Sequence, residues 1–415
     1  MMNYELTFAL IGEHLPHSYS REIHALIGAY NYTLQELSPE EFDFFMKERL
    51  FQGINVTIPY KQAVIPYLDE IDGTARAIGA VNTVINRDGK LIGYNTDLYG
   101  LTRLILRLGL DLSGKKVLIL GTGGTSRTAC YAAEQLGAEE ILRVSRTGKE
   151  SSLTYEEALA SHADAQIIIN TTPCGMFPEP GAQPVSLDPF HALEGVVDVI
   201  YNPLRSRLVL DARSRGIPAD GGLYMLVAQA VRASELFQDT TRDADLCDII
   251  HDAILRWKEN LVLIGMPGSG KTTVGRYLVN NTGKKLRDMD RWIEKKAGKS
   301  IPEIFREDGE TAFRDLETEV IREFSKETGL IISTGGGAVL RPENVTLLRQ
   351  NGRLFWLNRD PADLVPTEDR PLADTEAKIK RLYLEREPVY RAAADVIIDV
   401  KGTPSQIADE IEVKR

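Results

Sequence analysis

The glycine-rich segment GMPGSGKTT at residues 265–273 restricts the possible folds of this chain more than any other feature. It matches the pattern G-x-x-x-x-G-K-[ST], and it directly follows the apolar run NLVLI at residues 260–264. A strand, a glycine loop and a helix in this order form a site where backbone N–H groups bind nucleotide phosphates. The segment therefore predicts a P-loop α/β domain, which begins only after a long preceding stretch of chain.

Composition limits the class of protein. The chain has 415 residues, enough for two or three domains, and 43% of them are hydrophobic, as in ordinary folded cores. Its net charge of −11 argues against nucleic acid as the main ligand. Cys130, Cys174 and Cys247 form no C-x-x-C pair, which is typical of a reducing compartment. No apolar run approaches the roughly 20 residues of a membrane span, so we expect a cytoplasmic protein without membrane contact. No motif indicates an oligomeric state.

A second strand–loop–helix unit starts at residues 115–120, KKVLIL, and continues with GTGGTSR. Its three loop glycines are typical of the tight turn in a Rossmann dinucleotide-binding unit. About 20 residues further on, where an NAD-binding unit places an acidic residue, the chain reads Ser145-Arg146-Thr147. An arginine there suits a 2′-phosphate, so the pattern favours NADP over NAD. The alternative is a surface arginine on a Rossmann-like domain without a cofactor.

A helix is predicted immediately before the P-loop strand. Six residues of the segment ADLCDIIHDAILRW are spaced like one helical face that would be buried. They are Leu246, Ile249, Ile250, Ala253, Ile254 and Trp257. The P-loop strand follows at Asn260 without a Gly/Ser linker, so we expect the two parts of the chain to abut.

Six short segments around the second glycine loop occur in an order that resembles the shikimate dehydrogenase family. They are HSYSREIH, GINVTIPYK, GAVNTV, GYNTD, NTTPCGM and GLYMLVAQA, and the resemblance covers essentially all of residues 1–257. It implies a two-lobed α/β enzyme that reduces 3-dehydroshikimate to shikimate with NADPH. The parts that it implies are a substrate-binding lobe at residues 1–105, a Rossmann NADP lobe at 106–221, and helices at 222–258 that return to the substrate lobe.

The same resemblance implies roles for individual residues. Lys61 and Asp97 match the catalytic pair, and a lysine ammonium can stabilise and protonate the alkoxide that develops when a ketone is reduced. Polar contacts to the substrate carboxylate and ring hydroxyls are expected from Ser18, Ser20, Thr57, Asn82 and Gln229. Contacts to NADP are expected from Gly121, Gly123, Gly124, Thr125, Ser145, Arg146, Thr147 and Met176.

Residues 259–415 resemble the shikimate kinase family. The P-loop is followed, in the family's order, by RDMDRWIE, DGETAFRDLE, STGGGAVL, EDRPL and REPVYRAAAD. The resemblance implies a P-loop α/β kinase with a parallel sheet, which transfers the γ-phosphoryl group of ATP to the 3-hydroxyl of shikimate with the help of Mg²⁺. The whole chain would then be a fused, bifunctional enzyme of chorismate and aromatic amino-acid biosynthesis.

Several kinase residues have expected tasks. Lys271 would neutralise the β- and γ-phosphates, and Thr272 would ligate Mg²⁺ with support from Asp288. Asp290, expected on the same extended segment as Asp288, matches the residue that contacts the acceptor hydroxyl. Arg370 lies in a short lid and could meet the transferring phosphoryl group. The ATP-binding positions are Gly268, Ser269, Gly270, Lys271, Thr272 and Thr273. The shikimate-binding positions are Asp290, Arg314, Gly335, Gly336, Gly337 and Arg386.

Departures from the family patterns leave alternatives open. Ser145 replaces the usual asparagine, and Glu150 takes the place of a second basic residue, which weakens the preference for NADP. The kinase lid lacks an upstream arginine that some family members place over the nucleotide base. The alternatives are a quinate or shikimate dehydrogenase that uses NAD, a P-loop kinase for another sugar acid, and a non-catalytic module in one half.

Overall fold

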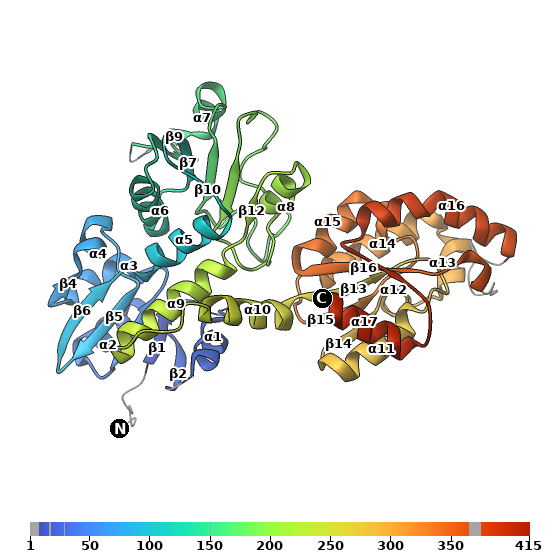
Figure 1. Cartoon of the computed structure of the whole chain (residues 1–415), viewed down its shortest axis with the longest axis horizontal. Helices are drawn as coiled ribbons and strands as arrows, with labels where there is room; N and C mark the ends of the chain where they lie inside the picture. The colour runs from blue at the N-terminus through green and yellow to red at the C-terminus, as the bar shows by residue number, and fades with distance from the viewer. Residues whose placement is uncertain (1–7, 16–17, 29, 150, 365–374) are drawn as a thin grey trace. The chain divides into compact units, whose positions relative to one another are not determined.

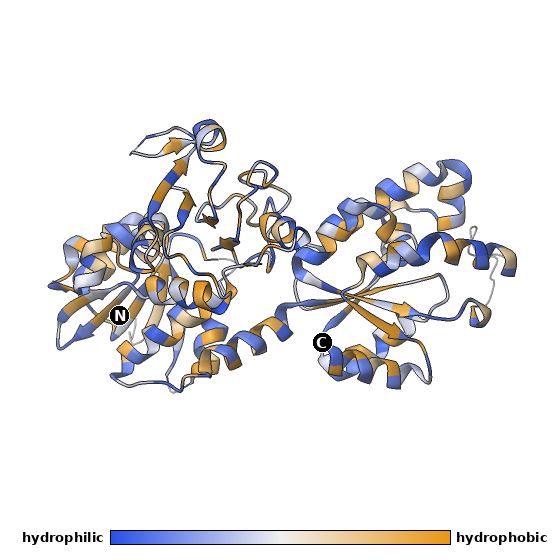
Figure 2. Cartoon of the chain, turned by 45° about the horizontal axis from the view of Figure 1, so that its top comes forward, coloured by the Kyte–Doolittle hydropathy of each residue, from blue (hydrophilic) through white to orange (hydrophobic). Residues whose placement is uncertain are grey.

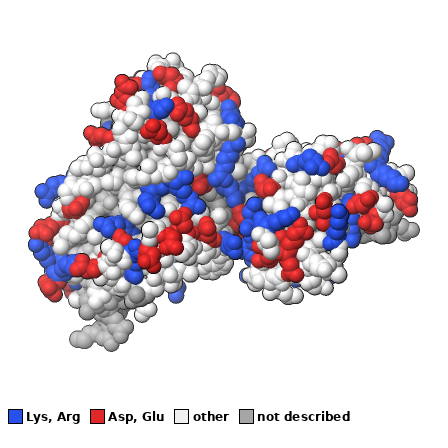
Figure 3. Space-filling model, viewed as in Figure 1, with Lys and Arg blue, Asp and Glu red and all other residues white. Residues whose placement is uncertain are grey.

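The computed structural model describes residues 8–15, 18–28, 30–149, 151–364 and 375–415 (Figure 1). The chain divides into two compact units, residues 1–254 and 255–415. Among the described helices, none combines the length and the apolar composition that a membrane crossing requires. On the face shown in Figure 3, acidic and basic side chains are interspersed over both units.

The first unit begins with a mixed six-stranded sheet in the order β2-β1-β3-β5-β6-β4. β1 and β3 are buried along their whole length, as the apolar runs FALIG and GINV predict. β1 pairs in parallel with β2 and β3, whereas β5 runs antiparallel to β3 and β6. The strands are β1 (Phe8–Gly12), β2 (Tyr32–Glu36), β3 (Gly53–Val56), β4 (Glu70–Ile71), β5 (Thr83–Arg87) and β6 (Lys90–Tyr94). The helices are α1 (Ser20–Ile27), α2 (Pro39–Glu48), α3 (Tyr60–Ala63) and α4 (Gly73–Ile78).

A second six-stranded sheet of the first unit is parallel throughout, in the order β12-β11-β10-β7-β8-β9. The chain adds β8 and β9 on one side of β7 and then returns to add β10 on the other side. Open α/β sheets bind ligands at such a reversal, outside the carboxyl ends of the strands. The strands are β7 (Lys116–Leu120), β8 (Glu140–Ser145), β9 (Leu153–Thr154), β10 (Ile167–Asn170), β11 (Gly195–Asp198) and β12 (Ala219–Asp220). The helices are α6 (Gly124–Gln135), α7 (Tyr155–Ser161) and α8 (Arg207–Ser214).

Two helices of the first unit pack very closely. α5 (Thr96–Arg107) follows the first sheet and α9 (Leu223–Gln238) follows the second. A β-carbon at Gly100 of α5 would lie 2.4 Å from the carbonyl oxygen of Met225 in α9, so the close approach requires glycine. This contact holds α9 against the helix that begins at Thr96.

The predicted helix before the P-loop exists as α10 (Leu246–Lys258), but its predicted buried face is partly wrong. Ile249 and Trp257 are 57% and 56% exposed. The buried residues are Cys247, Ile250, His251 and Ile254. They are spaced at i, i+3, i+4 and i+7, so the buried face is a regular helical one that includes a cysteine and a histidine. Of the six predicted residues, Ile250 and Ile254 are buried, whereas Ala253 is exposed like Ile249 and Trp257.

The second unit contains a parallel five-stranded sheet in the order β14-β15-β13-β16-β17. Alternate residues of β13 belong to hydrophobic clusters on opposite faces, Leu261 and Leu263 to one, Val262 and Ile264 to the other. Figure 2 shows these central strands as hydrophobic, as expected for a sheet covered by helices on both sides. The strands are β13 (Asn260–Ile264), β14 (Lys285–Asp288), β15 (Leu330–Ser333), β16 (Gly352–Asn358) and β17 (Val396–Asp399). The helices are α11 (Lys271–Thr282), α12 (Met289–Ala297), α13 (Ile301–Glu307), α14 (Gly309–Phe324), α15 (Pro342–Asn351), α16 (Glu376–Ala393) and α17 (Pro404–Lys414).

Candidate active sites

Lys61 and Asp97 lie in direct contact in the first unit. Lys61 belongs to α3, the short helix after β3, and Asp97 lies in the first turn of α5. Lys61 Nζ donates a hydrogen bond to Asp97 Oδ2 at 2.5 Å, and the two side chains are only 16% and 10% exposed. A mostly buried lysine with a carboxylate partner is held in one orientation and is still accessible from one side. The predicted pair is therefore an ion pair at the edge of a buried region.

Asn82 and Gln229 join this pair through Thr96. Asn82 Nδ2 donates to Asp97 Oδ1 at 2.9 Å, and Asn82 Oδ1 accepts from the backbone N–H of Thr96 at 2.7 Å. Gln229, on α9, accepts a hydrogen bond from Thr96 Oγ1 at 3.3 Å. Taken as whole residues, Asn82, Thr96, Asp97 and Gln229 are all less than 9% exposed. Four of the predicted substrate and catalytic residues thus share one hydrogen-bond network.

The remaining predicted substrate residues lie at the ends of β1 and β3. Ser20 is the buried first residue of α1, and its backbone N–H donates to Ser18 Oγ at 3.2 Å. Thr57 directly follows β3, and a β-carbon at Gly12 would lie 2.7 Å from Thr57 Cγ2. Gly12 ends β1, and the chain continues from there to Ser18 and Ser20. Thr57 follows β3, which pairs with β1 in parallel, so these predicted residues follow neighbouring strands at the same edge of the sheet.

The glycine loop after β7 lies beside the catalytic pair. Gly121 has φ +114°, and a β-carbon there would lie 2.6 Å from Thr171 Oγ1, so only glycine fits. A β-carbon at Gly124, the first residue of α6, would lie 4.0 Å from Lys61 Cβ. Thr125 lies in the same first turn. The N-terminus of α6 suits a pyrophosphate, which would then lie near Lys61.

The segment after β8 is organised by Ser145. Its hydroxyl bonds Ser152 Oγ at 2.7 Å and accepts from the backbone N–H of Gly148 at 3.1 Å, which closes a small loop. Arg146 and Thr147 are exposed on this loop. Met176, in the segment after β10, is 43% exposed. Glu150 lies outside the described residues.

Asp198 is a buried carboxylate at the end of β11 that the sequence analysis did not single out. It accepts hydrogen bonds from Asn170 Nδ2 at 3.0 Å, Ile200 N at 3.0 Å and Ser206 Oγ at 2.6 Å. Complete burial raises the pKa of Asp198 to about 7, against these three donors. Because Asn170 Oδ1 in turn accepts from Thr172 N at 3.0 Å, Asp198 helps to hold the loop that leads to Met176.

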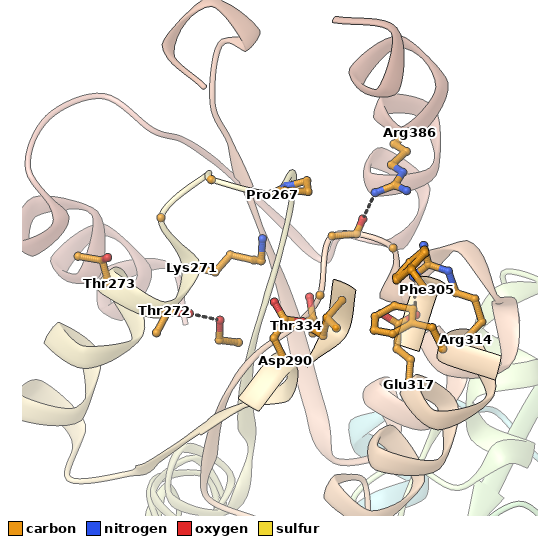
Figure 4. Close-up of a pocket in the computed structure, with 18 residues that line it drawn as sticks. Pro267, Lys271, Thr272, Thr273, Asp290, Phe305, Arg314, Glu317, Thr334 and Arg386 are labelled. Atoms are coloured by element: carbon orange, nitrogen blue, oxygen red, sulfur yellow. Dashed lines mark hydrogen bonds and ion pairs between the residues drawn. The ribbon is translucent and has the colours of Figure 1, made fainter. Parts of the chain in front are cut away.

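The second unit contains a cavity of about 320 Å³ at the carboxyl ends of its strands (Figure 4). Figure 4 shows Lys271 and Thr272 on one side, Arg314 and Arg386 on the other, and Asp290 between them. Lys271 Nζ donates to the carbonyl oxygens of Gly265 and Met266, both at 2.9 Å. Gly268 and Gly270, with φ +83° and +96°, turn the loop around this amine. Ser269 is fully buried and Thr273 lines the cavity, whereas the predicted lid residue Arg370 lies outside the described residues.

Thr272 and Asp288, the residues predicted to lie at a magnesium ion, are joined by a hydrogen bond. Thr272 Oγ1 donates to Asp288 Oδ2 at 2.8 Å and lies 3.0 Å from Ser333 Oγ. Hydroxyl and carboxylate oxygens are the ligands that Mg²⁺ prefers. The prediction that Asp290 continues the extended segment is wrong, because β14 ends at Asp288, whose side chain caps α12 by accepting from Arg291 N at 3.4 Å. Asp290 instead lies in the first helical turn, which directs it toward the cavity.

The three glycines after β15 touch the charged groups of the cavity. A β-carbon at Gly335 would lie 3.1 Å from Asp290 Oδ1, and one at Gly337 would lie 2.2 Å from Arg314 Nη1. Arg386 Nη1 donates to the carbonyl oxygen of Gly336 at 2.9 Å. The glycine triplet therefore leaves room for two guanidinium groups and a carboxylate around the same loop.

Two glutamates that the sequence analysis did not select bind Arg314. Glu317 Oε2 accepts from Arg314 Nη1 at 2.9 Å, and Glu310 Oε1 accepts from Nη2 at 3.1 Å. Glu317 is completely buried, and burial raises its pKa although Arg314 opposes this. Their i, i+3 and i, i+4 spacings to Arg314 within one helix are the signal that could have identified them.

Comparisons with known proteins match both units. Residues 10–84 match the family model "Shikimate dehydrogenase substrate binding domain", and residues 267–414 match "Shikimate kinase". The shikimate dehydrogenase (NADP(+)) of Clostridium perfringens is 35% identical over 266 residues, which are 60% of this chain and 97% of that protein.

Solved structures give the same result for the first unit. Shikimate dehydrogenase 1 from Peptoclostridium difficile shares 37% identity with a TM-score of 0.56, covering 60% of this chain and 97% of that one. The Thermus thermophilus enzyme, solved with NADP(H) and shikimate, shares 30% identity with a TM-score of 0.53, covering 60% and 99%. The chain therefore belongs to the shikimate dehydrogenase family and carries a shikimate kinase domain in its second unit, so that two enzymes of the shikimate pathway are fused in one polypeptide.

Proposed function

We propose that this chain catalyses two consecutive reactions, the NADPH-dependent reduction of 3-dehydroshikimate to shikimate and the ATP-dependent phosphorylation of shikimate at its 3-hydroxyl. The observation that carries the proposal is that each unit has its own group of reactive residues, Lys61–Asp97 beside a dinucleotide loop and two arginines beside a P-loop. We assign the substrate lobe to residues 1–105 and 222–258, the NADP lobe to residues 106–221 and the kinase to residues 259–415.

In the reduction, Lys61 acts at the ketone oxygen. NADPH, once bound, would supply a hydride to the carbonyl carbon. The Lys61 ammonium would stabilise the developing alkoxide and give it a proton. Asp97 keeps the amine oriented through the 2.5 Å contact, and solvent then reprotonates it. Ser18 and Ser20 would bind the substrate carboxylate, and Thr57, Asn82 and Gln229 would contact the ring hydroxyls.

The exposed Arg146 supports NADP as the cofactor of this step. A guanidinium forms bidentate hydrogen bonds with a phosphate, and only NADP carries a 2′-phosphate at this position. Gly121, Gly123, Gly124 and Thr125 would bind the pyrophosphate at the start of α6, with Ser145, Thr147 and Met176 around the cofactor.

In the phosphorylation, the chain mainly positions the reactants, because phosphoryl transfer has a loose transition state. Arg314 and Arg386 would hold the shikimate carboxylate against the loop of Gly335, Gly336 and Gly337. Asp290 would orient the 3-hydroxyl toward the γ-phosphate, whose charge Lys271 neutralises. Thr272, supported by Asp288, would bind Mg²⁺, and Arg370 would complete the phosphate contacts from the lid.

A one-pot reaction tests both halves. The purified protein is incubated with 3-dehydroshikimate, NADPH, ATP and Mg²⁺, and the products are identified by mass. Shikimate 3-phosphate is the expected product. Shikimate alone would contradict the kinase assignment, and absence of turnover with 3-dehydroshikimate but phosphorylation of added shikimate would contradict the dehydrogenase assignment. Replacing NADPH by NADH, and 3-dehydroshikimate by quinate with NAD⁺, tests the catabolic alternative.

A further inference from the structure

A row of buried polar side chains lies behind the catalytic pair of the dehydrogenase site. Asn55 lies in β3, Asn82 directly precedes β5, Thr83 begins β5, and Thr96 begins α5. These four side chains are 3%, 3%, 0% and 2% exposed. Polar groups buried to this extent must bond one another, because water does not reach them.

The hydroxyl of Thr83 is the central point of this row. It accepts from Asn55 Nδ2 at 3.0 Å and lies 3.0 Å from Thr96 Oγ1 and 3.2 Å from Asn82 Oδ1. A further hydrogen bond holds Asn55 in place, because its Oδ1 accepts from the hydroxyl of Tyr32 at 2.7 Å. Thr83 has a single hydroxyl proton, which it can give either to Thr96 or to Asn82. When the Thr96 proton goes to Gln229, Thr83 donates to Thr96, whose Oγ1 also accepts from Asn82 Nδ2.

The neighbours of Asn82 determine which way its amide points. Its Oδ1 accepts from Thr96 N at 2.7 Å, while its Nδ2 donates to Thr96 Oγ1 at 3.1 Å and to Asp97 Oδ1 at 2.9 Å. If the amide turned over, its NH₂ group would face the N–H of Thr96, two donors together, and its oxygen would face the Asp97 carboxylate. The surrounding bonds therefore allow one orientation, in which Asn82 donates to the catalytic carboxylate.

We propose that Thr83 is a positioning residue of the dehydrogenase, which through Asn82 and Thr96 fixes the orientation of Asp97 and so of Lys61. The inference rests on the proposed function, since it concerns the reduction step. Thr83 has no place in the substrate or cofactor contacts proposed above. Its effect is transmitted from its hydroxyl to Asn82, either directly or through Thr96, and then from Asn82 to Asp97.

The test compares Thr83→Val with Thr83→Ser in the full-length protein. Valine has nearly the shape of threonine but no hydroxyl, whereas serine keeps the hydroxyl and loses one methyl group. We expect Thr83→Val to lower kcat for 3-dehydroshikimate reduction about tenfold, which corresponds to one or two weakened buried hydrogen bonds. The KM for NADPH is expected to stay within about twofold of the wild-type value, because the glycine loop after β7 does not include any of the four buried polar residues. Thr83→Ser is expected to retain most of the wild-type kcat.

The outcomes separate this inference from its alternatives. Equal kcat values for Thr83→Val and the wild type would overturn it, and so would equal losses in the Val and Ser variants, because packing rather than the hydroxyl would then matter. NADPH binding, followed by its fluorescence, shows whether each variant has a folded first unit. If the wild-type protein itself does not reduce 3-dehydroshikimate, the proposed function fails, which is a result distinct from an unaffected variant.

Discussion

Arg314, which we propose binds the substrate, is bonded to two carboxylates in this structure. Glu317 is buried beside it, but the side chain of Glu310 is 53% exposed at the other end of the guanidinium. The carboxylate of shikimate would have to compete with Glu310 for Arg314. Because the Glu310 carboxylate of this pair is half exposed to solvent, we expect the pair to contribute only about 1 kcal/mol, so that one substitution can remove the competition.

Glu310→Gln is therefore expected to lower the KM for shikimate about two- to threefold without changing the kinase kcat. The amide leaves a neutral partner in place of the competing charge, and the difference should shrink at high salt. Steady-state kinetics with varied shikimate measures it. Glu410→Gln is the matched control, because Glu410 also forms an i, i+4 pair, with Lys414 on α17, and lies outside the cavity lining. An unchanged or raised KM in Glu310→Gln would show that Glu310 assists the substrate instead of competing with it.

At the level of single residues, the sequence predicts a contact only where both residues belong to a recognisable motif. The contact between Lys61 and Asp97 was predicted from family order, and the geometry brings the two side chains together. Thr83 was not predicted, because its bonds reach Asn55 and Thr96, and nothing in one sequence shows which buried hydroxyls meet across a sheet. The role of each site residue stays a prediction until it is tested by substitution.

The ends of elements were harder to predict than the elements themselves. The strand before Asp288 was expected, but the side-chain cap that turns the chain into α12 at that residue was not recognised. The face of α10 was similarly misjudged because Cys247 and His251 are buried while Ile249 is exposed. In both cases tertiary packing decided a detail that periodicity alone leaves open.

The end of β11 carries a pH-dependent contribution to stability. Burial raises the pKa of Asp198 from 3.8 to about 7. Between these values the unfolded chain has lost the proton that the folded protein still holds, so the free energy of unfolding of the first unit decreases as pH rises through this window. The decrease is complete once the pH exceeds the folded-state value.

Asp198→Asn is expected to remove this dependence. The amide oxygen can still accept from Asn170 and Ile200, and the amide NH₂ can donate to the hydroxyl of Ser206, so the local bonds are retained. Thermal unfolding followed by calorimetry from pH 4.5 to 7.5 should show a smaller loss of Tm with rising pH in the variant. The transition that NADP⁺ shifts identifies the first unit.

The control is Asp188→Asn, because Arg215 hydrogen-bonds the 77%-exposed Asp188 and lowers its pKa. Because its pKa is lowered in the folded protein, Asp188 contributes a stability that increases as pH rises. Its removal therefore cannot abolish the decrease that we assign to Asp198. Parallel Tm profiles for the wild type and Asp198→Asn would contradict the assignment of this dependence to Asp198.

At the scale of the whole molecule, each proposed site draws its described residues from one unit. Lys61, Asp97 and the loop of Gly121 belong to residues 1–254, and Lys271, Arg314 and Arg386 belong to residues 255–415. Among the described residues, none that we propose for one reaction belongs to the other unit. The units are linked by a shared metabolite, because the product of the first reaction is the acceptor of the second.

Two single variants mixed together should therefore perform the full reaction. Lys61→Ala is expected to abolish reduction and spare phosphorylation, since the ketone loses its proton donor, and Lys271→Ala is expected to abolish only phosphorylation. Neither variant alone should convert 3-dehydroshikimate to shikimate 3-phosphate.

In a mixture, shikimate released by Lys271→Ala can diffuse to the intact kinase of Lys61→Ala. The final product should therefore appear after a lag in which free shikimate accumulates. Mass spectrometry over time, with the wild-type protein at the same number of active sites, measures this lag. If the mixture yields shikimate but no phosphate ester, although Lys61→Ala phosphorylates added shikimate, the two sites do not exchange shikimate through solution and the independence argued here is wrong.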